Sequence, residues 1–455
     1  MKDSQPWPKT EDVKKGELGV SVKDLSNQFK IVTKIFAPAL LIALGACSEE
    51  TVMVDTVIEN VTVYSGRGDE PFIATIGVRD GVIAGISTPA DASFQAERTI
   101  DGTNKFLTPG LWDAHVHLRS AEEGGLGLPA KTFIEAGITS VQDLGGYPER
   151  LKKLEEQIAS GAVTGPTVHP AYFMLNGKSF AGFQHVVTNE AHVLSAIEEL
   201  ADLGAAQVKI HRALSPDLLP VVTKHAHSAG LTVTGHIPLG MHPLAACEAG
   251  MDGVQHIGSF IEALVSVAPE GEDNSAAAIE YMLSDAGQPL YDCLRDRGVR
   301  VTPTLISYQN RARKLAGEGE ISQEFIDFIN SLGAIVRRMY KEGVILLVGT
   351  DTSDFNPDLR IPPGTWLLDE LEMLEEAGIP AHALIPMATL NAAEAIGVGD
   401  KTGTIGQGKA ADMLLLSKDP AQSASAFRSI EMVFKAGEII REKGSEVYVE
   451  AEEAE

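Results

Sequence analysis

The sequence predicts an α/β protein, a (β/α)8 TIM barrel with a small β-sandwich domain built from both ends of the chain. Between residues 108 and 400, eight short apolar strand candidates alternate with amphipathic helical stretches. Polar side chains stand at the ends of these strand candidates, which is where such a barrel has its active site. Short strands with tight turns occupy both flanks of this region.

The eight strand candidates are residues 112–117, 138–144, 167–173, 206–211, 232–237, 253–257, 299–305 and 344–350. Helical stretches lie between them, for example Pro216–Ser228, ended by Gly230, and Leu367–Ala377, ended by Gly378. A doubly wound sheet is the competing architecture. It usually carries a glycine-rich phosphate loop after its first strand, and Gly145-Gly146 alone is not one.

The two flanks read as β structure. In the first, the turn at 79–81 joins strands at 76–78 and 82–84, and in the second the turn at 435–437 joins 432–434 and 438–440, after a strand at 413–416. Neither flank has enough apolar residues for its own core. We therefore expect one composite β domain made of residues 47–107 and 401–455, the latter with an acidic tail, around a barrel at 108–400.

The N-terminal region, residues 1–46, reads as a secretion leader. Residues 35–46 are uncharged and apolar, follow Lys30 and Lys34, and at twelve residues are too short to cross a bilayer core of about 30 Å. Leu44-Gly45-Ala46-Cys47 resembles a bacterial lipoprotein box, so we expect lipidation at Cys47 and a periplasmic location, with Ser48 favouring the outer membrane. A buried helix with a chance cysteine is the alternative, and the true start codon stays open.

Charge and cysteine content exclude several classes of protein. Acidic residues outnumber basic ones by 63 to 37, for a net charge of −26, and no basic stripe is interleaved with aromatics, so nucleic acid is excluded as a partner. The expected partner is a small-molecule substrate, with membrane contact only through the lipid anchor and a homo-oligomer left open. Three cysteines are too few for a disulfide framework, and whether Cys247 and Cys293 pair stays open.

Six polar residues at the strand ends carry the chemistry. His115-Val116-His117 alternates, so both imidazoles leave the first strand on one side. Singly, each residue has an ordinary explanation as a core histidine, a lysine reaching water or a helix cap. Together in one barrel mouth they would be prohibitively costly to bury without an organising cation, and they suit divalent zinc, manganese or iron. They are His115, His117, Lys209, His236, His256 and Asp351.

At these residues the sequence resembles the amidohydrolase superfamily, specifically its binuclear imidazolonepropionase-like and prolidase-like branch. The resemblance spans residues 52–440. It is strongest in Leu-Thr-Pro-Gly-Leu-Trp-Asp-Ala-His-Val-His at 107–117, Gly-Thr-Asp at 349–351, Thr-Leu-Asn-Ala-Ala at 389–393 and Gly-Thr-Ile-Gly-Gln-Gly-Lys-Ala-Ala-Asp at 403–412.

The resemblance implies roles for these residues. His115, His117 and Asp351 would hold one divalent ion, His236 and His256 a second, and Lys209, carboxylated by CO₂, would bridge the two. Zinc is the expected metal. Hydrolysis would use a metal-bridging hydroxide with Asp351 as general acid and base.

The implied function is hydrolysis of carbon–nitrogen bonds in small peptide-like substrates, by a dipeptidase or an N-acyl-amino-acid hydrolase. A cyclic-amide hydrolase or a lactonase with the same metal centre is the alternative. A binding lipoprotein without catalysis is a third possibility, against which the intact ligand set argues.

The sequence departs from the branch around two ligands. Strands five and six read Gly235-His236-Ile237 and Gln255-His256-Ile257, where much of the branch has His-Ala-His and Glu-His-Gly. Substrate contacts are therefore predicted from position alone, with Arg212 as the expected clamp for a substrate carboxylate. The loop 353–365 is a candidate wall and 271–275 a candidate turn. The candidate substrate contacts, each of which has a structural or surface role as its alternative, are His169, Tyr172, His211, Arg212 and Tyr308.

Overall fold

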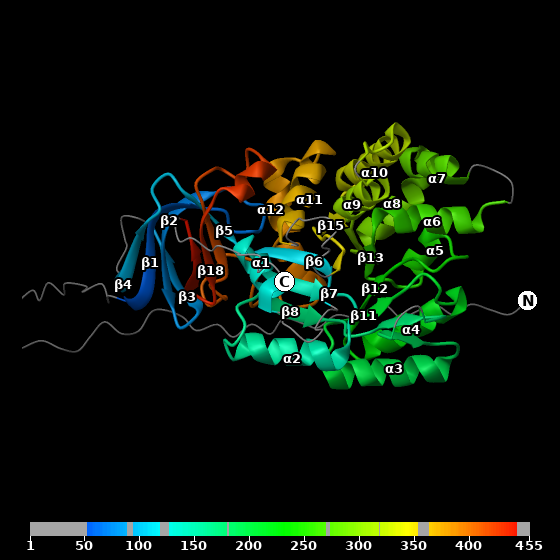
Figure 1. Cartoon of the computed structure of the whole chain (residues 1–455), viewed down its shortest axis with the longest axis horizontal. Helices are drawn as coiled ribbons and strands as arrows, with labels where there is room; N and C mark the ends of the chain where they lie inside the picture. Colours follow the sequence, from blue (N-terminus) through cyan, green and yellow to red (C-terminus); the bar gives the residue numbers. More distant parts are fainter. Residues whose placement is uncertain are drawn as a thin grey trace, which may run out of the picture. The chain divides into compact units, whose positions relative to one another are not determined.

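The computed structural model of the protein describes residues 52–88, 94–118, 127–179, 182–269, 274–317, 319–353 and 364–443 (Figure 1). The predicted leader with Cys47, the acidic tail after residue 443 and most of the loop 353–365 lie outside the described residues. Of the predicted turn at 271–275, only Asn274 and Ser275 are described, and they begin a helix.

The barrel is present as predicted. Its strands pair in parallel in chain order. Backbone hydrogen bonds from Ala206 N to Pro170 O and from Ala114 N to Val348 O, both 2.9 Å, close the two remaining gaps. The strands are β6 (Leu111–His117), β7 (Ile138–Asp143), β8 (Thr167–Pro170), β11 (Gln207–Ile210), β12 (Thr232–Gly235), β13 (Gly253–Gln255), β14 (Arg300–Thr302) and β15 (Ile345–Leu346).

Helices connect these strands and lie around them (Figure 1). The predicted helical stretches Pro216–Ser228 and Leu367–Ala377 form α4 and α11, with boundaries close to those expected. The helices are α1 (Gly127–Glu135), α2 (Pro148–Ala159), α3 (Glu190–Leu203), α4 (Leu219–Ser228), α5 (Pro243–Glu248), α6 (Ile257–Val267), α7 (Asn274–Leu283), α8 (Gln288–Asp296), α9 (Leu305–Ala316), α10 (Gln323–Lys341), α11 (Thr365–Glu376), α12 (Ala381–Met387) and α13 (Leu390–Ala395).

The third strand differs from its prediction. It ends at Pro170, and Tyr172 then takes a left-handed conformation (φ 55°) that interrupts an extended strand. The chain continues as β9 (Met174–Asn176), which pairs with β11, and β10 (Gln184–Val186), which pairs with β9. This two-strand insertion between the third and fourth barrel strands was absent from the prediction. A short strand, β16 (Thr352–Ser353), also pairs with β6.

The composite β domain takes its strands from both ends of the chain, as predicted. Eight strands form one sheet in the order β19-β18-β17-β5-β1-β2-β3, with β4 paired to β1. Its core is separate from that of the barrel and includes Ile58, Ile76, Leu107, Met413 and Phe434. The strands are β1 (Val52–Val63), β2 (Phe72–Arg79), β3 (Val82–Ser87), β4 (Phe94–Asp101), β5 (Phe106–Pro109), β17 (Met413–Leu416), β18 (Ile430–Lys435) and β19 (Glu438–Glu442).

Both predicted hairpins have two-residue turns whose backbone conformation explains the sequence. Asp80-Gly81 has φ values of 52° and 78°, and Ala436-Gly437 has 47° and 79°. Positive φ at both central positions defines the type I′ turn, whose twist matches that of paired strands. The turns bring Arg79 opposite Val82 and Lys435 opposite Glu438.

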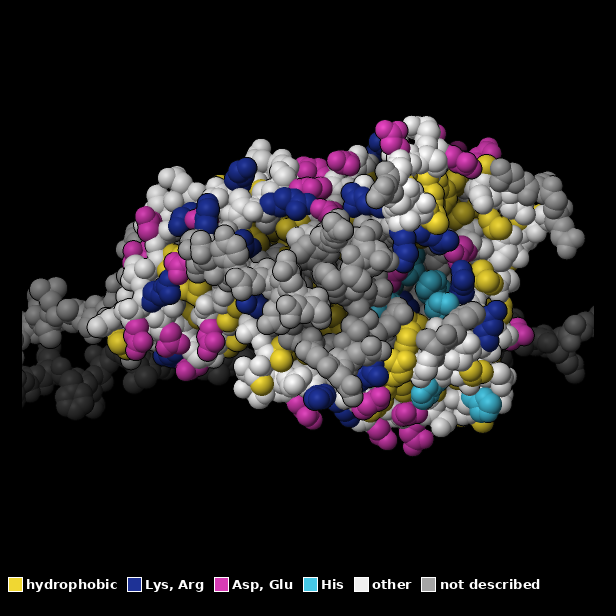
Figure 2. Space-filling view, viewed as in Figure 1, with side chains coloured by type: hydrophobic (Ala, Val, Ile, Leu, Met, Phe, Trp, Pro, Cys, Tyr) yellow, Lys and Arg dark blue, Asp and Glu magenta, His cyan; other side chains and the backbone are white. Residues whose placement is uncertain are grey.

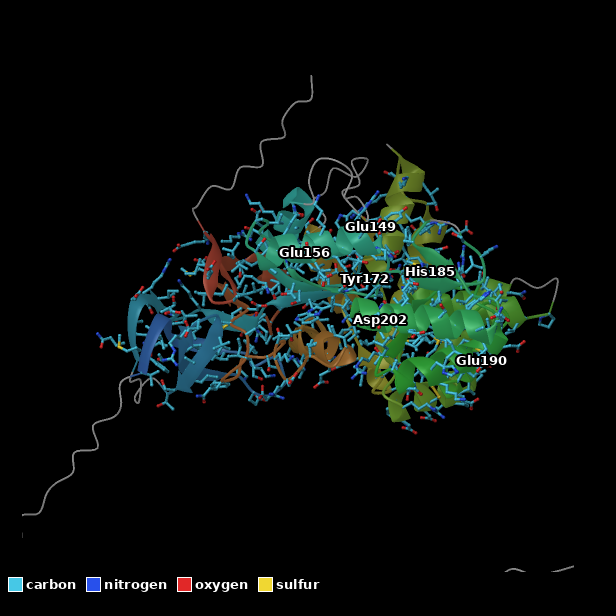
Figure 3. The ribbon with its side chains drawn as sticks, turned by 90° about the horizontal axis from the view of Figure 1, so that it is seen from below. Glu149, Glu156, Tyr172, His185, Glu190 and Asp202 are labelled. Carbon is cyan, nitrogen blue, oxygen red and sulfur yellow. A yellow bond between two sulfur atoms is a disulfide. The ribbon has the colours of Figure 1, made fainter. Side chains whose placement is uncertain are left out.

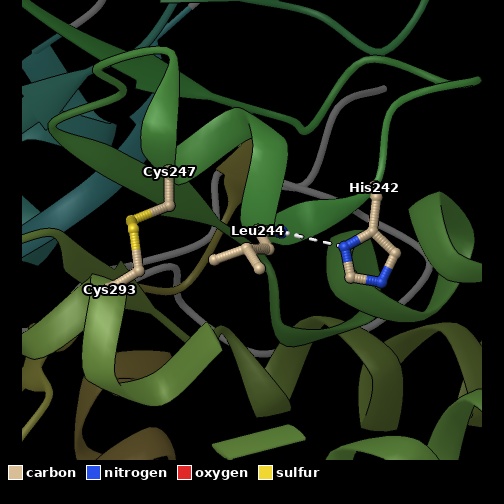
Figure 4. The surroundings of a disulfide bond; sticks show 4 residues. All are labelled: His242, Leu244, Cys247 and Cys293. Atoms are coloured by element: carbon tan, nitrogen blue, oxygen red, sulfur yellow. Dashed lines mark hydrogen bonds between the residues drawn. A yellow bond between two sulfur atoms is a disulfide. The ribbon is translucent and has the colours of Figure 1, made fainter. Parts of the chain in front are cut away.

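The question of cysteine pairing is answered by the fold. Cys247 of α5 and Cys293 of α8 form a disulfide, with Cα atoms 6.4 Å apart (Figure 4). At the other end of α5, His242 Nδ1 accepts a hydrogen bond from Leu244 N, so this rim histidine caps the helix (Figure 4). Among the described helices, none combines the length and apolarity needed to cross a bilayer.

We expect the disulfide to stabilise the barrel. It closes a loop with a sequence separation of 46, and bonds of this kind contribute about 2–4 kcal/mol to the free energy of unfolding. Urea unfolding should show this loss in a Cys247→Ser/Cys293→Ser variant. Reducing agent should destabilise the wild type to the same extent and leave the variant unchanged. Equal stability of wild type and variant would contradict the expectation.

Candidate metal centre and substrate cavity

Five of the six strand-end residues line a single cavity of about 420 Å³, and the sixth, His115, is fully buried beside them. Figure 2 shows histidine side chains gathered in a hollow of the surface, next to lysine, arginine and hydrophobic side chains. The residues around the cavity are His117, Met174, Phe183, Gln184, Lys209, His211, Arg212, His236, His256 and Asp351.

Three of the six strand-end residues, His115, His117 and Asp351, form a compact group with the spacing of metal ligands. Asp351 Oδ1 lies 3.4 Å from His115 Nε2 and 3.4 Å from His117 Nε2, and the two nitrogens are 3.4 Å apart. A tetrahedral ion with bonds of about 2.1 Å holds its ligand atoms about 3.4 Å from each other. The donor atoms of this group therefore fit one divalent ion.

Lys209 connects this group to the other two histidines. Its side chain is fully buried, and Nζ lies 3.4 Å from His115 Nε2. The ring of His256 is 4.7 Å from that of His115 and 4.8 Å from that of His236, measured between centroids. Two imidazoles alone are a sparse ligand set for a second ion, whereas a carboxylated Lys209 would add an oxygen ligand.

Burial keeps the imidazoles of His115, His236 and His256 in their neutral, metal-binding form. It lowers the pKa of His115 and of His236 well below the usual value, and Lys209 and the adjacent histidines lower both further. The pKa of His256 falls to about 4, again mainly through burial.

Asp351, in contrast to these neutral histidines, is charged. Burial would raise its pKa, but His256, His117 and Lys209 together lower it to about 2, so the carboxylate is ionised at neutral pH. It is the negative group facing the imidazoles and the lysine.

Two buried carboxylates that were not predicted from the sequence support the group of His115, His117 and Asp351. Asp113 accepts hydrogen bonds from the Thr350 hydroxyl (2.6 Å), Thr350 N (3.0 Å) and His115 N (3.1 Å), which ties β6 to the segment that carries Asp351. Burial raises the pKa of Asp113 to about 7, against the effect of these bonds. Asp143 accepts from Leu118 N and Gly145 N.

His117 is oriented by the same region. Its Nδ1 lies 2.9 Å from the carbonyl oxygen of Gly145, so Nδ1–H donates and the lone pair of Nε2 is left for a metal ion beside Asp351 Oδ1. Asp113 lies two residues before His115 in the sequence, and that proximity was the available signal for its role.

A second supporting network surrounds His256. Its Nδ1 is 2.8 Å from the hydroxyl of Thr304. The next two backbone amides, Leu305 N and Ile306 N, donate to the fully buried carboxylate of Glu370 on α11 (2.9 and 2.6 Å). Glu370 therefore caps α9 and fixes the turn that presents Thr304 to His256.

Three successive strand ends share an uncommon backbone conformation. His256, Thr304 and Asp351 have φ values of 66°, 52° and 56°, a region that residues other than glycine seldom adopt. Such conformations persist where the surrounding contacts enforce them, and they concentrate at functional sites. The sequence does not predict these positive φ values, because none of the three residues is glycine.

The five predicted substrate contacts divide into two sets. His211 and Arg212 line the cavity, where Arg212 is half exposed and pairs with Glu262 of α6 at 3.3 Å. The remaining three, His169, Tyr172 and Tyr308, are not among the residues around the cavity.

These three side chains are engaged elsewhere, so we no longer assign them to the substrate. The ring of His169 stacks on Trp112 at 4.9 Å. The hydroxyl of Tyr172 donates to Glu155 of α2 (3.0 Å), and Figure 3 shows this tyrosine in the region of the α2 residues Glu149 and Glu156. The hydroxyl of Tyr308 accepts from Gly258 N (3.0 Å) and supports the turn after His256.

Known proteins resemble this chain in sequence and in fold. A sequence profile described as the amidohydrolase family matches residues 106–440. A 5-methylthioadenosine/S-adenosylhomocysteine deaminase from Desulforudis audaxviator is 24% identical over 393 residues, covering 79% of this chain and 84% of its own.

Two solved structures share the fold. A Xaa-Pro dipeptidase with bound methionine superposes with a TM-score of 0.63 at 20% identity, over 84% of this chain and 99% of its own. A putative prolidase from Bifidobacterium longum superposes with a TM-score of 0.67 at 22% identity, over 87% and 97%.

We expect Thr304→Val to weaken binding of a divalent ion by about 10- to 100-fold, because the variant removes the partner that orients His256. Competition with a chromogenic chelator measures this affinity. Thr302→Val is the matched control: it lies two residues earlier on β14, and its buried hydroxyl has no hydrogen-bond partner among the described residues. Equal affinities in the two variants would contradict the role of Thr304.

Proposed function

The chain belongs to the amidohydrolase family, and we propose that it is a metal-dependent hydrolase of amide C–N bonds in small peptide-like substrates. Dipeptides and N-acyl amino acids are the proposed substrate classes. The observation that carries the proposal is the ionised Asp351, whose Oδ1 lies 3.4 Å from two histidine nitrogens at the edge of a 420 Å³ cavity.

The proposed ligands follow from the donor set. His115, His117 and Asp351 would hold one ion, and His236 and His256 would hold a second, with zinc proposed for both because imidazole and carboxylate suit it. Lys209 is proposed to carry a carbamate, since a buried ammonium 3.4 Å from His115 Nε2 would repel a cation. When bound, the ions would supply an activated water and would polarise the substrate carbonyl.

The protein's own groups would perform the proton transfers. With a pKa of about 2, Asp351 is a carboxylate at neutral pH and can accept a proton. Its side chain is about one-third exposed and lines the cavity, so it can pass that proton to the leaving amine of a bound substrate. The buried Asp113 positions it through Thr350.

The cavity wall favours linear substrates with a free carboxylate. Arg212 stands on this wall, and a guanidinium pairs well with carboxylates. A dipeptide or an N-acyl amino acid carries that group before hydrolysis, whereas a simple lactone or cyclic amide gains it only on ring opening. For this reason ring opening of a lactone or cyclic amide is the second candidate function, after hydrolysis of linear amides. Deamination, the activity in the name of the D. audaxviator relative, also breaks a C–N bond and would release ammonia instead of an amino acid.

We further propose that the protein works in an oxidising compartment as a lipoprotein. The Cys247–Cys293 disulfide supports this, because such bonds persist outside reducing cytosol. The lipoprotein-box pattern at Leu44–Cys47 supports the anchor itself. Mass spectrometry of the protein from bacterial membranes should find a lipid-modified Cys47 as the first residue. An unmodified N-terminus upstream of Cys47 would contradict the anchor.

The test of function is amine release from a panel of dipeptides, N-acyl amino acids, cyclic amides and lactones. The protein would be loaded with zinc in the presence of bicarbonate, so that Lys209 can be carboxylated. We expect turnover of linear carboxylate-bearing amides. Asp351→Asn should lower kcat by about 10²- to 10⁴-fold while most of the metal stays bound, because it removes the proton acceptor.

Lys209→Ala should lose both turnover and metal, because it removes the proposed bridge. Wild-type rates in Asp351→Asn would refute its role as acid and base. Ring opening without amide cleavage would move the assignment to a cyclic-amide hydrolase or a lactonase.

A further inference from the structure

Asn176, on the inserted strand β9, has an amide whose orientation is fixed by the backbone. The side chain is fully buried. Its Oδ1 accepts hydrogen bonds from Gly177 N (3.0 Å) and from Ala213 N (3.1 Å). Because two donors face the oxygen, the NH₂ group must point the other way.

That NH₂ group determines which nitrogen of His211 carries a proton. Asn176 Nδ2 is 3.3 Å from His211 Nδ1 and 3.4 Å from Gln184 Oε1. An amide nitrogen is a donor only, so His211 Nδ1 must be the acceptor. The proton of the imidazole then sits on Nε2, and that atom is a hydrogen-bond donor.

The donor is placed next to the candidate metal centre. His211 lines the cavity, and its Nδ1 edge faces the buried Asn176, so its Nε2 edge is the one directed away from this support. The ring is 4.5 Å from that of His236 between centroids. Arg212, the next residue in the chain, lines the same cavity.

An N–H donor and a guanidinium from consecutive residues form a suitable site for a carboxylate. Charge-assisted bonds of this kind are the strongest that neutral and cationic donors make to an anion. The ion pair between Arg212 and Glu262 does not block the site, because both side chains are about half exposed and exposed pairs contribute little. A substrate carboxylate can therefore replace Glu262 as the partner of Arg212.

We propose that Asn176 holds His211 as an Nε2–H donor, and that His211 and Arg212 together bind the carboxylate of the substrate. Asn176 is a positioning residue in this arrangement, and the β9–β10 insertion supplies it. The inference rests on the proposed function and deepens it: the substrate is an amide whose amino-acid portion ends in a free carboxylate next to the scissile bond.

The test compares the binding of N-acetyl-L-leucine with that of N-acetyl-L-leucinamide, which lacks the carboxylate. Calorimetry at pH 8 uses the full chain, metal loaded and carrying Asp351→Asn in every sample, because the unsubstituted protein would hydrolyse an N-acyl amino acid during the titration. We expect this Asp351→Asn protein to prefer the acid. His211→Leu should lose about 10- to 100-fold in affinity for the acid and keep its affinity for the amide, because one hydrogen bond to a charged group is lost.

Two further variants separate the hydrogen bond from a structural role. His211→Gln retains an N–H donor and should recover most of the acid preference. Asn176→Leu removes the NH₂ group that holds Nδ1 as the acceptor, so the proton is no longer fixed on Nε2, and the acid preference should fall by less than in His211→Leu. The matched control, His242→Asn, changes a histidine that caps α5 outside the cavity and should leave both affinities unchanged.

The outcomes distinguish this inference from the proposed function. An unchanged acid preference in His211→Leu would overturn the subsite, as would an equal loss of acid and amide binding, which indicates general damage. Selective acid binding that depends on His211, without turnover of any panel substrate, would support the subsite and reject the hydrolase. Turnover of carboxylate-bearing amides with a KM unaffected by His211→Leu would support the hydrolase and reject the subsite.

Discussion

Lys209 is fully buried with its Nζ atom 3.4 Å from His115 Nε2, and the rest of the site must accommodate that contact. An ammonium, four imidazoles and one carboxylate cannot all be charged in a small volume of low polarity. The structure resolves this through burial, which lowers the pKa of His115, His236 and His256 so that they are neutral, while the carboxylate of Asp351 is ionised. A carbamate on Lys209 would complete the balance by turning the cation into a ligand.

The surroundings of this group hold it by hydrogen bonds from several strands. Asp113 links the first strand to the eighth, and Thr304 links the seventh to His256 on the sixth. The strained φ values of His256, Thr304 and Asp351 fall at these same positions. Strain of about 1–3 kcal/mol per residue persists only where contacts over-determine the conformation. The candidate ligands are therefore held by hydrogen bonds between neighbouring strand ends of the barrel.

The proposed selection of a substrate rests on cavity residues other than the candidate metal ligands. The barrel and its metal-ligand pattern support many reactions across unrelated proteins, so the fold alone does not name a substrate. Here Met174 and Gln184 of the β9–β10 insertion, with His211 and Arg212, form part of the cavity wall. That wall presents an imidazole held by Asn176 and a guanidinium held only at the surface. In the proposed function, the ligand set would define the bond that is broken, and the carboxylate subsite supported by the insertion would define the group next to it.

The sequence by itself determined the eight barrel strands, both hairpins and the six candidate ligands, but not the β9–β10 insertion. Periodic apolar residues set the strands, and Asp-Gly and Ala-Gly pairs set the hairpins. The proximity of His115, Lys209 and Asp351 could be predicted because parallel strand ends meet at one end of a closed barrel. The family profile and the shared fold bear out that reading of the architecture.

Tertiary structure alone decided what those groups touch. Asp113 and Thr350 are 237 positions apart, and the partners of Glu370 lie 64 and 65 positions away, so no local pattern reports these contacts. The pairing of Cys247 with Cys293, and the turn of Tyr172 away from the cavity towards Glu155, likewise depend on how helices pack against the strands. Periodicity tells which residues share a face, but the direction of a side chain is settled by the packing of segments distant in the sequence.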